Sequence, residues 1–305
     1  MESLPVSASV RRLGPSAATE TELAEMVRAH YDNEPLLRLA GEIHFDTELS
    51  RAEVRAAARV YGDRPPDLVY LPCAGTLRHA APLLAEGVRQ VIAVDLSGPS
   101  LNAGLGRNVS AGLRSRVIVY QGDVRDAGQV LPDEGVRMVL LGGNSLGDIT
   151  TRAGHQQFLH ALARSLSPGG VLVFDYVSDR YLPAGTRPET SEWPQVWHGP
   201  KGDVDVVDRR TRTCRPLGTS GMALLSIRCE ILDQHGRRPL VPAHTYSKLV
   251  VPDALLKEQF AEAGLELTNV GPVAEWSDYH RDRIDRVGDL GMMGEPDCWY
   301  RAVRP

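Results

Sequence analysis

The chain has 305 residues, of which 42% are hydrophobic and 24% charged, as is usual for one large globular domain or a domain with an elaboration. Its formal net charge of −5 argues against the broad basic face of a nucleic-acid-binding domain. No apolar run approaches the roughly 20 residues that cross a membrane, the N-terminus lacks a signal-peptide core, and the four cysteines form no CxxC pair. We therefore expect a soluble protein of the reducing cytoplasm, with no metal, nucleic-acid or membrane partner.

The N-terminal sixty residues are predicted to be mainly helical. Residues 1–18 are rich in Ser, Ala, Pro and Arg, and we expect a loose tail there. Two Ser/Thr-x-x-Glu capping boxes follow, beginning at Thr19 and at Ser50. Each precedes a stretch with helical periodicity, so residues 19–62 are expected to form a helical cap.

From residue 63 onward, short apolar runs alternate with helical stretches. The runs read DLVYLP, QVIAVDL, RVIVYQGD, VRMVLLGG and GGVLVFDYV. Helices are expected over 76–86, 98–112 and 151–166. Strands separated by helices in this way are typical of a parallel sheet, and strands that are apolar on both faces belong inside one covered by helices on both sides.

Residues 182–246 break this rhythm. Runs such as MALLSIRCEILD alternate apolar and polar residues, which favours antiparallel strands. A helix and strand then return in PDALLKEQFAEAGLELTNV, and CWYRAVRP ends the chain as a last strand. We predict an α/β fold: a Rossmann-like, doubly wound, mainly parallel seven-stranded sheet built from 63–181 and 247–305. It carries the N-terminal helical cap and a small antiparallel β insertion after strand 5.

Ligands of open parallel sheets bind beyond the carboxyl ends of the strands, so the residues that follow each strand are the candidates for a ligand site. The first strand enters the loop PCAGTL, whose one glycine is Gly75. The second ends at Asp95, which could accept hydrogen bonds from both ribose hydroxyls or cap the next helix. The third ends at Asp123, which could accept from an adenine amino group while the Val124 N–H donates to a ring nitrogen; a turn aspartate is the alternative.

The next two strand ends also carry polar groups. In LLGGNSLGDI, Gly142 and its neighbour let the backbone approach a ligand, and Asn144 and Ser145 supply polar side chains. The fifth strand ends in FDYV, which places Asp175 and Tyr176 at the mouth of the sheet. Groups that could bind a nucleotide-like ligand follow several successive strands in the expected order. This combination indicates a ligand site far more specifically than any single residue does.

With these motifs the chain resembles the class I S-adenosylmethionine-dependent methyltransferases, in the small-molecule branch similar to glycine N-methyltransferase. The first loop of that family typically reads LDLGCGTGRHA, and YLPCAGTLRHA stands in its place here. GDVRD falls on the adenine motif, NSLG on the fourth motif, and LVVPDALLKEQFAEAGLELTNV on the late "tPeeLrelleeAGFevvev". The resemblance covers about residues 20–305 and is strongest over 67–176 and 246–271.

The resemblance implies S-adenosyl-L-methionine as cofactor, S-adenosyl-L-homocysteine as product and a small-molecule acceptor beneath the β insertion. The cofactor residues it implies are Tyr31, Cys73, Ala74, Gly75, Thr76, Asp95, Leu96, Asp123, Val124, Gly142 and Asn144. The candidates for a catalytic base or orienting group are Tyr176 and Tyr246. The candidate substrate contacts are Ser145, Arg180 and His198. A homodimer is one assembly that the family would allow.

Three residues depart from the family pattern. Leu71 replaces its acid, and Cys73 and Leu77 replace its first and third glycines. We predict that Gly75 makes the closest backbone approach to the cofactor, that Leu77 turns into the core, and that glycine at 77 leaves a competent enzyme roughly unchanged.

Two functional hypotheses follow. The first is methylation of a small molecule, at nitrogen or oxygen and in secondary metabolism, by in-line displacement aided by proximity. The second is a methyltransferase fold that binds the cofactor or another ligand without methyl transfer. An NAD-type dehydrogenase is disfavoured because the GxGxxG loop is missing.

Overall fold

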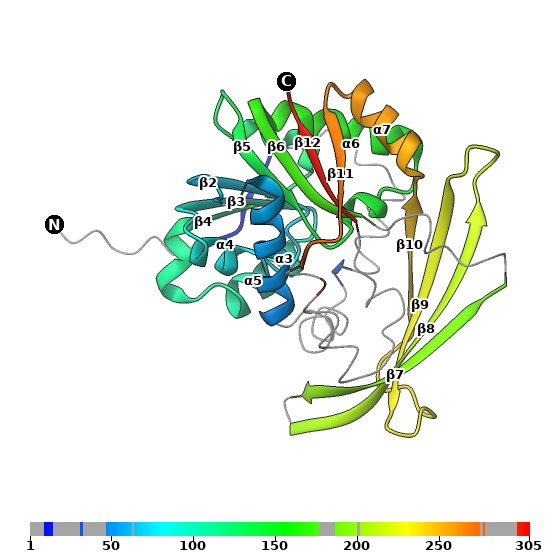
Figure 1. Cartoon of the computed structure of the whole chain (residues 1–305). Coiled ribbons are helices and arrows are strands. Elements are labelled where there is room, and N and C mark those ends of the chain that lie inside the picture. The colour runs from blue at the N-terminus through cyan, green and yellow to red at the C-terminus, as the bar shows by residue number, and fades with distance from the viewer. Residues whose placement is uncertain are drawn as a thin grey trace.

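The structure is a computed structural model that describes residues 9–14, 31–32, 47–62, 64–176, 187–199, 202–274, 277 and 298–305. These residues form an α/β core and a second, antiparallel sheet at its side (Figure 1). Among them, no helix is both long enough and apolar enough to cross a membrane.

The core sheet has eight strands in the order β1-β4-β3-β2-β5-β6-β12-β11. They are β1 (Arg11–Arg12), β2 (Leu68–Pro72), β3 (Gln90–Asp95), β4 (Val117–Gln121), β5 (Val136–Leu141), β6 (Leu166–Tyr176), β11 (Glu266–Gly271) and β12 (Cys298–Val303). Strands β2 to β6 are parallel, whereas β12 is antiparallel to both β6 and β11. All strands but β1 were predicted, and the Rossmann-like fold is confirmed. The strand order reverses beside β2, which places a switch point at its carboxyl end.

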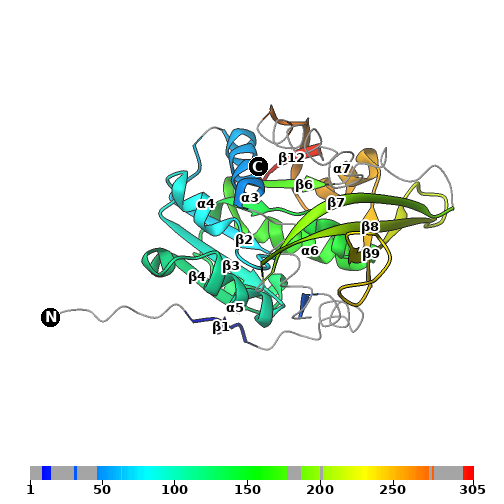
Figure 2. The same ribbon diagram turned by 90° about the horizontal axis from the view of Figure 1, so that it is seen from below.

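Strand β1 corrects the expectation of a loose tail at residues 11 and 12. Arg11 and Arg12 pair in parallel with the end of β4, and the Leu13 N–H donates to Gln121 O at 3.0 Å. Figure 2 shows β1 at the sheet edge beside β4. A two-residue strand has no hydrophobic periodicity, so the sequence pattern could not indicate it.

Helices cover both faces of the core sheet. The α-helices are α3 (Thr47–Tyr61), α4 (Ala80–Ala85), α5 (Gly98–Arg107), α6 (Arg152–Ser165) and α7 (Asp253–Glu262). The 3₁₀-helices are η3 (Ala111–Arg116), η4 (Val124–Gln129) and η5 (Ser145–Asp148). Val69 and Leu71 of β2 pack in the cluster that contains α3, α4 and α5, whereas Tyr70 packs with α6 and α7. Alternate strand residues thus serve two cores, as expected for a doubly wound sheet.

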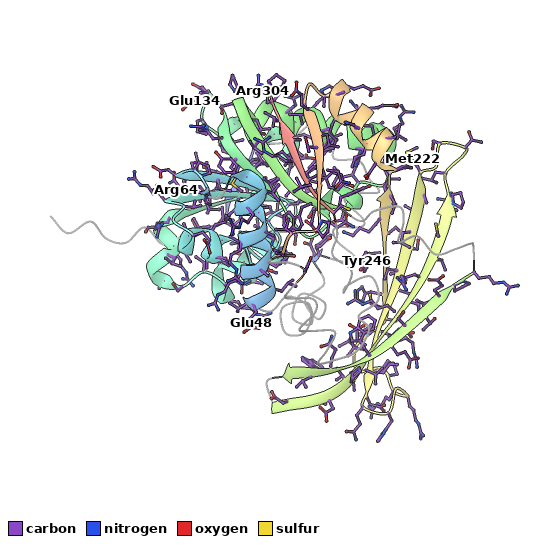
Figure 3. All side chains as sticks on the ribbon, in the orientation of Figure 1. Glu48, Arg64, Glu134, Met222, Tyr246 and Arg304 are labelled. Carbon is purple, nitrogen blue, oxygen red and sulfur yellow. The ribbon has the colours of Figure 1, made fainter. Side chains whose placement is uncertain are left out.

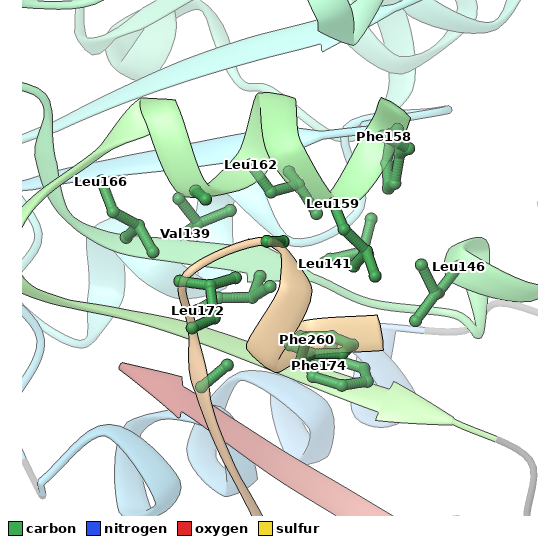
Figure 4. Packing of buried hydrophobic residues seen from close by; sticks show 14 of the residues in the cluster. Val139, Leu141, Leu146, Phe158, Leu159, Leu162, Leu166, Leu172, Phe174 and Phe260 are labelled. Atoms are coloured by element: carbon green, nitrogen blue, oxygen red, sulfur yellow. The ribbon is translucent and has the colours of Figure 1, made fainter. Parts of the chain in front are cut away.

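The core between α6, α7 and the sheet is shown in Figure 4. Leu159 and Leu162 of α6 are fully buried against it. Phe174 of β6 stacks on Phe260 of α7, with ring centroids 5.2 Å apart and an interplanar angle of 7°. Burial of each such side chain contributes about 1.5–3 kcal/mol. This packing fixes the position of α6, whose residues Gly154 and Phe158 form part of a pocket wall.

The antiparallel insertion after β6 is confirmed. Its strands, in the order β10-β9-β8-β7, are β7 (Glu189–Gly199), β8 (Gly202–Pro216), β9 (Ala223–Asp233) and β10 (His244–Val250). Each strand is antiparallel to its neighbour. The last strand continues to Val250, so the sheet extends four residues beyond the predicted boundary at 246.

The predicted helix starts needed correction. Helix α3 begins at Thr47, so Ser50 is buried within it and does not open it. Glu53, the expected partner in that capping box, instead forms ion pairs with Arg78 and His79. The predicted helix over 76–86 starts only at Ala80, and the one over 98–112 divides into α5 and η3. The predicted helix that follows Thr19 lies outside the described residues.

Candidate functional site

A pocket lies at the carboxyl ends of the parallel strands and holds about 760 Å³ of space between atoms, part of it open to solvent. Its wall consists of Tyr31, Cys73, Gly75, Asp95, Leu96, Asp123, Val124, Arg125, Ser145, Asp148, Ile149, Gly154 and Phe158. The first seven of these residues and Ser145 were predicted from the sequence, so the structure brings eight of the predicted site residues together.

The loop after β2 follows a left-handed course at three residues. The φ angles are 51° at Cys73, 49° at Gly75 and 56° at Leu77. Glycine adopts this region without strain, whereas other residues do not. Leu77 is 0% exposed and packs in the core beneath the loop, which confirms that it turns inward. The backbone thus keeps a course suited to glycine although two of the family's glycines are replaced.

Cys73 is partly exposed at the pocket wall and is a free thiol. Burial raises the pKa of this thiol well above its ordinary value, and Asp95 raises it further. The sulfur is therefore neutral at physiological pH, which argues against a nucleophilic cysteine.

Helix α5 holds the loop from below. The Asn108 side-chain amide, just beyond α5, donates to Thr76 O at 2.7 Å. A Cβ atom added at Gly104 would lie within 3.0 Å of the Thr76 backbone, so this position has room for glycine alone. The sequence alone did not indicate a role for Gly104, because its contact with Thr76 joins segments that are 28 residues apart.

Asp95 links this loop to the second strand. Its Oδ2 accepts from the Gly75 N–H at 2.7 Å, and its Oδ1 accepts from the Ser97 N–H at 2.8 Å. The N-cap of α5 is Ser97, which excludes Asp95 as the cap of that helix. Burial raises the pKa of Asp95 to about 6, although the two N–H donors lower it. This half-buried carboxylate at the pocket wall is held by two backbone donors and can still accept hydrogen bonds from hydroxyl groups of a ligand.

Asp123 is the turn aspartate that the sequence offered as one alternative, and its contact with adenine stays a prediction. It is the N-cap of η4, where its side chain accepts from the Arg125 N–H, and it also lines the pocket beside Val124. The capping contact fixes the carboxylate of Asp123, a residue that is only 6% exposed, at the end of the third parallel strand.

The wall near η5 joins three separate segments. The Tyr31 hydroxyl donates to Asp148 Oδ2 at 2.8 Å, and Lys248 Nζ of β10 lies 2.7 Å from Asp148 Oδ1. Lys248 also donates to Asn144 O at 3.1 Å. Burial and the Asp148 carboxylate raise the pKa of Tyr31, so its hydroxyl is neutral. Asp148 therefore connects the N-terminal segment, the core and the insertion at the pocket.

The two predicted catalytic tyrosines lie off the pocket wall. The Tyr176 hydroxyl donates to Leu249 O at 2.6 Å and accepts from the Val251 N–H at 3.2 Å. The side chain is 1% exposed and burial raises its pKa, so the placement favours a structural role that fixes the end of β10 to β6. Tyr246 lies on the side of β10 that faces the core (Figure 3), with Lys248 Nζ 5.8 Å from its ring centroid.

Four predicted cofactor residues are not among those that line the pocket. The Ala74 N–H donates to Val94 O at 3.1 Å, Thr76 O accepts a hydrogen bond from the Asn108 side-chain amide, and Gly142 lies close to the His79 ring. The Asn144 N–H donates to Asp175 Oδ2 at 2.9 Å. These contacts hold the loops at the strand ends in place.

Two predicted substrate residues cannot be placed at the site. Arg180 lies outside the described residues. His198 belongs to β7, where its backbone pairs with Asp203, and its side chain lies outside the described set.

Five wall residues were missed by the sequence analysis: Arg125, Asp148, Ile149, Gly154 and Phe158. Arg125 stands two residues after Asp123 and Asp148 four after Asn144, so the strand-end rule could have included both. Gly154 and Phe158 come from α6, and only the packing of that helix brings them to the pocket.

No family model matches the chain, and no curated protein matches its sequence. Solved structures match its fold. The aminopentose methyltransferase CalS10 of Micromonospora echinaspora, solved with bound S-adenosylmethionine, has 17% identity and a TM-score of 0.58 over 84% of this chain and 92% of its own. The methyltransferase CcbJ of Streptomyces caelestis has 19% identity and a TM-score of 0.59 over 84% and 94%. The sugar N-methyltransferase KedS8 of Streptoalloteichus has 18% identity and a TM-score of 0.53 over 97% of both chains.

The fold is therefore that of the S-adenosylmethionine-dependent methyltransferases of class I, as the resemblance implied. At these identities the match concerns the fold, and function has to be argued from the site.

Proposed function

We propose that the protein transfers a methyl group from S-adenosyl-L-methionine to a nitrogen or oxygen of a small molecule. The observation that carries this proposal is the single pocket wall in which Asp95 and Asp123 follow successive strands beside the Cys73–Gly75 loop. Two carboxylates and an apolar surface at a topological switch point suit a nucleoside. The structural neighbours that are methyltransferases support the same assignment.

The residues present fit an adenosyl group. Asp95 is an acceptor for ribose hydroxyls, and Asp123 with the Val124 N–H would accept from and donate to the purine edge. Ile149 and Phe158 supply apolar wall for its faces. Below them, the loop from Cys73 to Gly75 would follow the methionine chain, with Gly75 as the closest backbone approach. When bound, the cofactor would supply a methyl group already activated on a sulfonium.

Proximity and orientation would be the main catalytic contribution of the protein. A neutral amine needs no base, whereas a hydroxyl acceptor would need its proton removed. CalS10 and KedS8 are described as acting on an aminopentose and on a sugar, which supports a small polar acceptor and a role in secondary metabolism. Our candidates for acceptor contacts are still Ser145, Arg180 and His198, and Tyr246 is still a candidate for a catalytic base or orienting group. A cytoplasmic homodimer also stays a prediction.

The binding half of the proposal is tested by calorimetric titration with S-adenosylmethionine and S-adenosylhomocysteine. We expect Asp95→Ala to weaken both by at least about tenfold, since charged hydrogen bonds contribute about 1.5–3 kcal/mol. The exposed Asp133→Ala is the matched control, and it should bind like the parent. No heat and no thermal shift with the parent protein would refute the proposal.

Turnover separates transfer from mere binding. Incubation with tritiated S-adenosylmethionine and a panel of amino sugars and hydroxylated acceptors should label a product. A protein that binds the cofactor but labels no acceptor would instead support the methyltransferase fold without methyl transfer.

A further inference from the structure

Arg125 makes a fork-shaped contact with Asp123 in the pocket wall. Its Nε donates to Asp123 Oδ1 at 3.0 Å and its Nη2 to Oδ2 at 2.6 Å, while its backbone N–H donates to Oδ1 at 2.8 Å. The Asp123 side chain is 5% exposed and that of Arg125 is 19% exposed. Such bidentate pairing fixes the plane of a carboxylate in addition to attracting it.

The same guanidinium is anchored from the opposite side. Arg125 Nη1 donates to Gln157 Oε1 of α6 at 2.9 Å. Gly154 and Phe158, on either side of Gln157 in α6, both line the pocket. Arg125 thus spans the wall from the third strand end to α6, and neither end of its guanidinium can turn without losing a contact.

This arrangement has a consequence for ligand recognition. A carboxylate accepts hydrogen bonds and cannot donate them when ionised. Held in one plane beside the Val124 N–H, it matches a purine edge that carries an amino group and repels one that carries a carbonyl oxygen. Without the fork, the side chain of Asp123 could rotate away from either edge.

We propose that Arg125 is a positioning residue for Asp123 and thereby sets the preference for adenine over hypoxanthine in the cofactor. The inference rests on the proposed function, because it assumes that the purine of the cofactor lies against Asp123. The Nε, Nη1 and Nη2 atoms of Arg125 each donate one hydrogen bond, to Asp123 or to Gln157, which holds the guanidinium in the plane of the Asp123 carboxylate.

The test compares the dissociation constants of S-adenosylhomocysteine and S-inosylhomocysteine by calorimetry. We expect the parent protein to prefer the adenosyl compound by at least about 30-fold, since a carbonyl facing a buried carboxylate leaves both acceptors unpaired. Arg125→Met should reduce this ratio to a few-fold. Arg125→Lys, which keeps the charge but lacks the fork, should also lower it. Arg137→Met, at an exposed position of β5, is the control and should keep the ratio.

A double-mutant cycle covers the case in which Arg125→Met also loosens the fold. If Arg125 acts through Asp123, its removal should not change the ratio further in an Asp123→Asn background. Equal weakening of both ligands by Arg125→Met, or an additional change of the ratio in that background, would overturn the inference. Parent protein that binds both ligands equally would overturn it while leaving the proposed function intact, whereas parent protein that binds neither would refute the proposed function itself.

Discussion

Leu77 offers a direct test of how the loop after β2 tolerates the loss of a glycine. The residue is fully buried, yet its φ is 56°. From the family pattern alone, glycine at 77 would be neutral. The structure predicts instead that both Leu77→Ala and Leu77→Gly destabilise the protein, because each removes a side chain that fills the core.

The magnitudes follow from four terms. Loss of a buried leucine side chain costs about 2–5 kcal/mol. Glycine at 77 then loses the last buried methyl group, about 0.8 kcal/mol, and some unfolded-state restriction, about 0.4–1 kcal/mol. It regains about 1–2 kcal/mol by removing left-handed strain. Glycine and alanine at this position should therefore have the same stability within about 0.8 kcal/mol.

Leu101 is the matched control, since it is equally buried in the same cluster but lies within α5. There, glycine should cost about 1–2 kcal/mol more than alanine, from helix propensity and the lost methyl group. The four variants are compared by urea unfolding monitored by circular dichroism. If glycine cost as much more than alanine at 77 as it does at 101, the reasoning from backbone strain would be refuted.

Three further outcomes are expected. Gly104→Ala should destabilise the protein by about 1–3 kcal/mol and weaken S-adenosylhomocysteine binding, because the new Cβ would meet the Thr76 backbone. Affinity for S-adenosylhomocysteine should fall as the pH drops below 6, because protonation of Asp95, whose pKa burial raises to about 6, leaves a weaker hydrogen-bond acceptor for the ligand hydroxyls. The contribution of His155 to stability should fall by about 3 kcal/mol as the pH drops from 6.5 to 4, since burial lowers the pKa of His155 to about 4 while the unfolded chain takes up the proton near 6.5.

Each of these outcomes has its own control. Gly106→Ala lies in the same helix, where an added Cβ meets nothing within 4 Å, and it should be neutral or stabilising; equal effects of the two alanines in unfolding would contradict the packing argument. Asp95→Asn should flatten the pH dependence seen by calorimetry, and an unchanged slope would exclude Asp95 as its origin. His155→Gln should reduce the acid loss seen in urea titrations, whereas His160→Gln, exposed on the same helix, should not.

Most of the core was predictable because its signals are local. Each buried strand is a short apolar run, and the polar residues Asp95 and Asp123 follow their strands directly in sequence. Helix starts were predicted less well. The capping box at Ser50 failed because Glu53 is used by Arg78 and His79, which lie about 25 residues farther along the chain and become neighbours only in the fold.

The two tyrosines predicted to be catalytic show the same limit. Tyr176 stands at a strand end, as a catalytic group would, but its hydroxyl is taken up by the backbone of residues 249 and 251. The sequence around Tyr176 does not predict those hydrogen-bond partners, which lie more than 70 residues farther along the chain. The contact depends on where β10 returns to the core after the insertion.

By itself, the sequence determined the alternation of strands and helices, the β insertion and the carboxylates at successive strand ends, because hydrophobic periodicity and strand-end position are properties of short segments. Only the tertiary structure decided that Leu77 fills the core while the loop keeps a glycine-like course, and that Gly104 must be small. It also decided that Arg125 clamps Asp123 to the wall formed by α6. Each of these depends on atoms from distant segments meeting within a few ångströms, which periodicity does not encode.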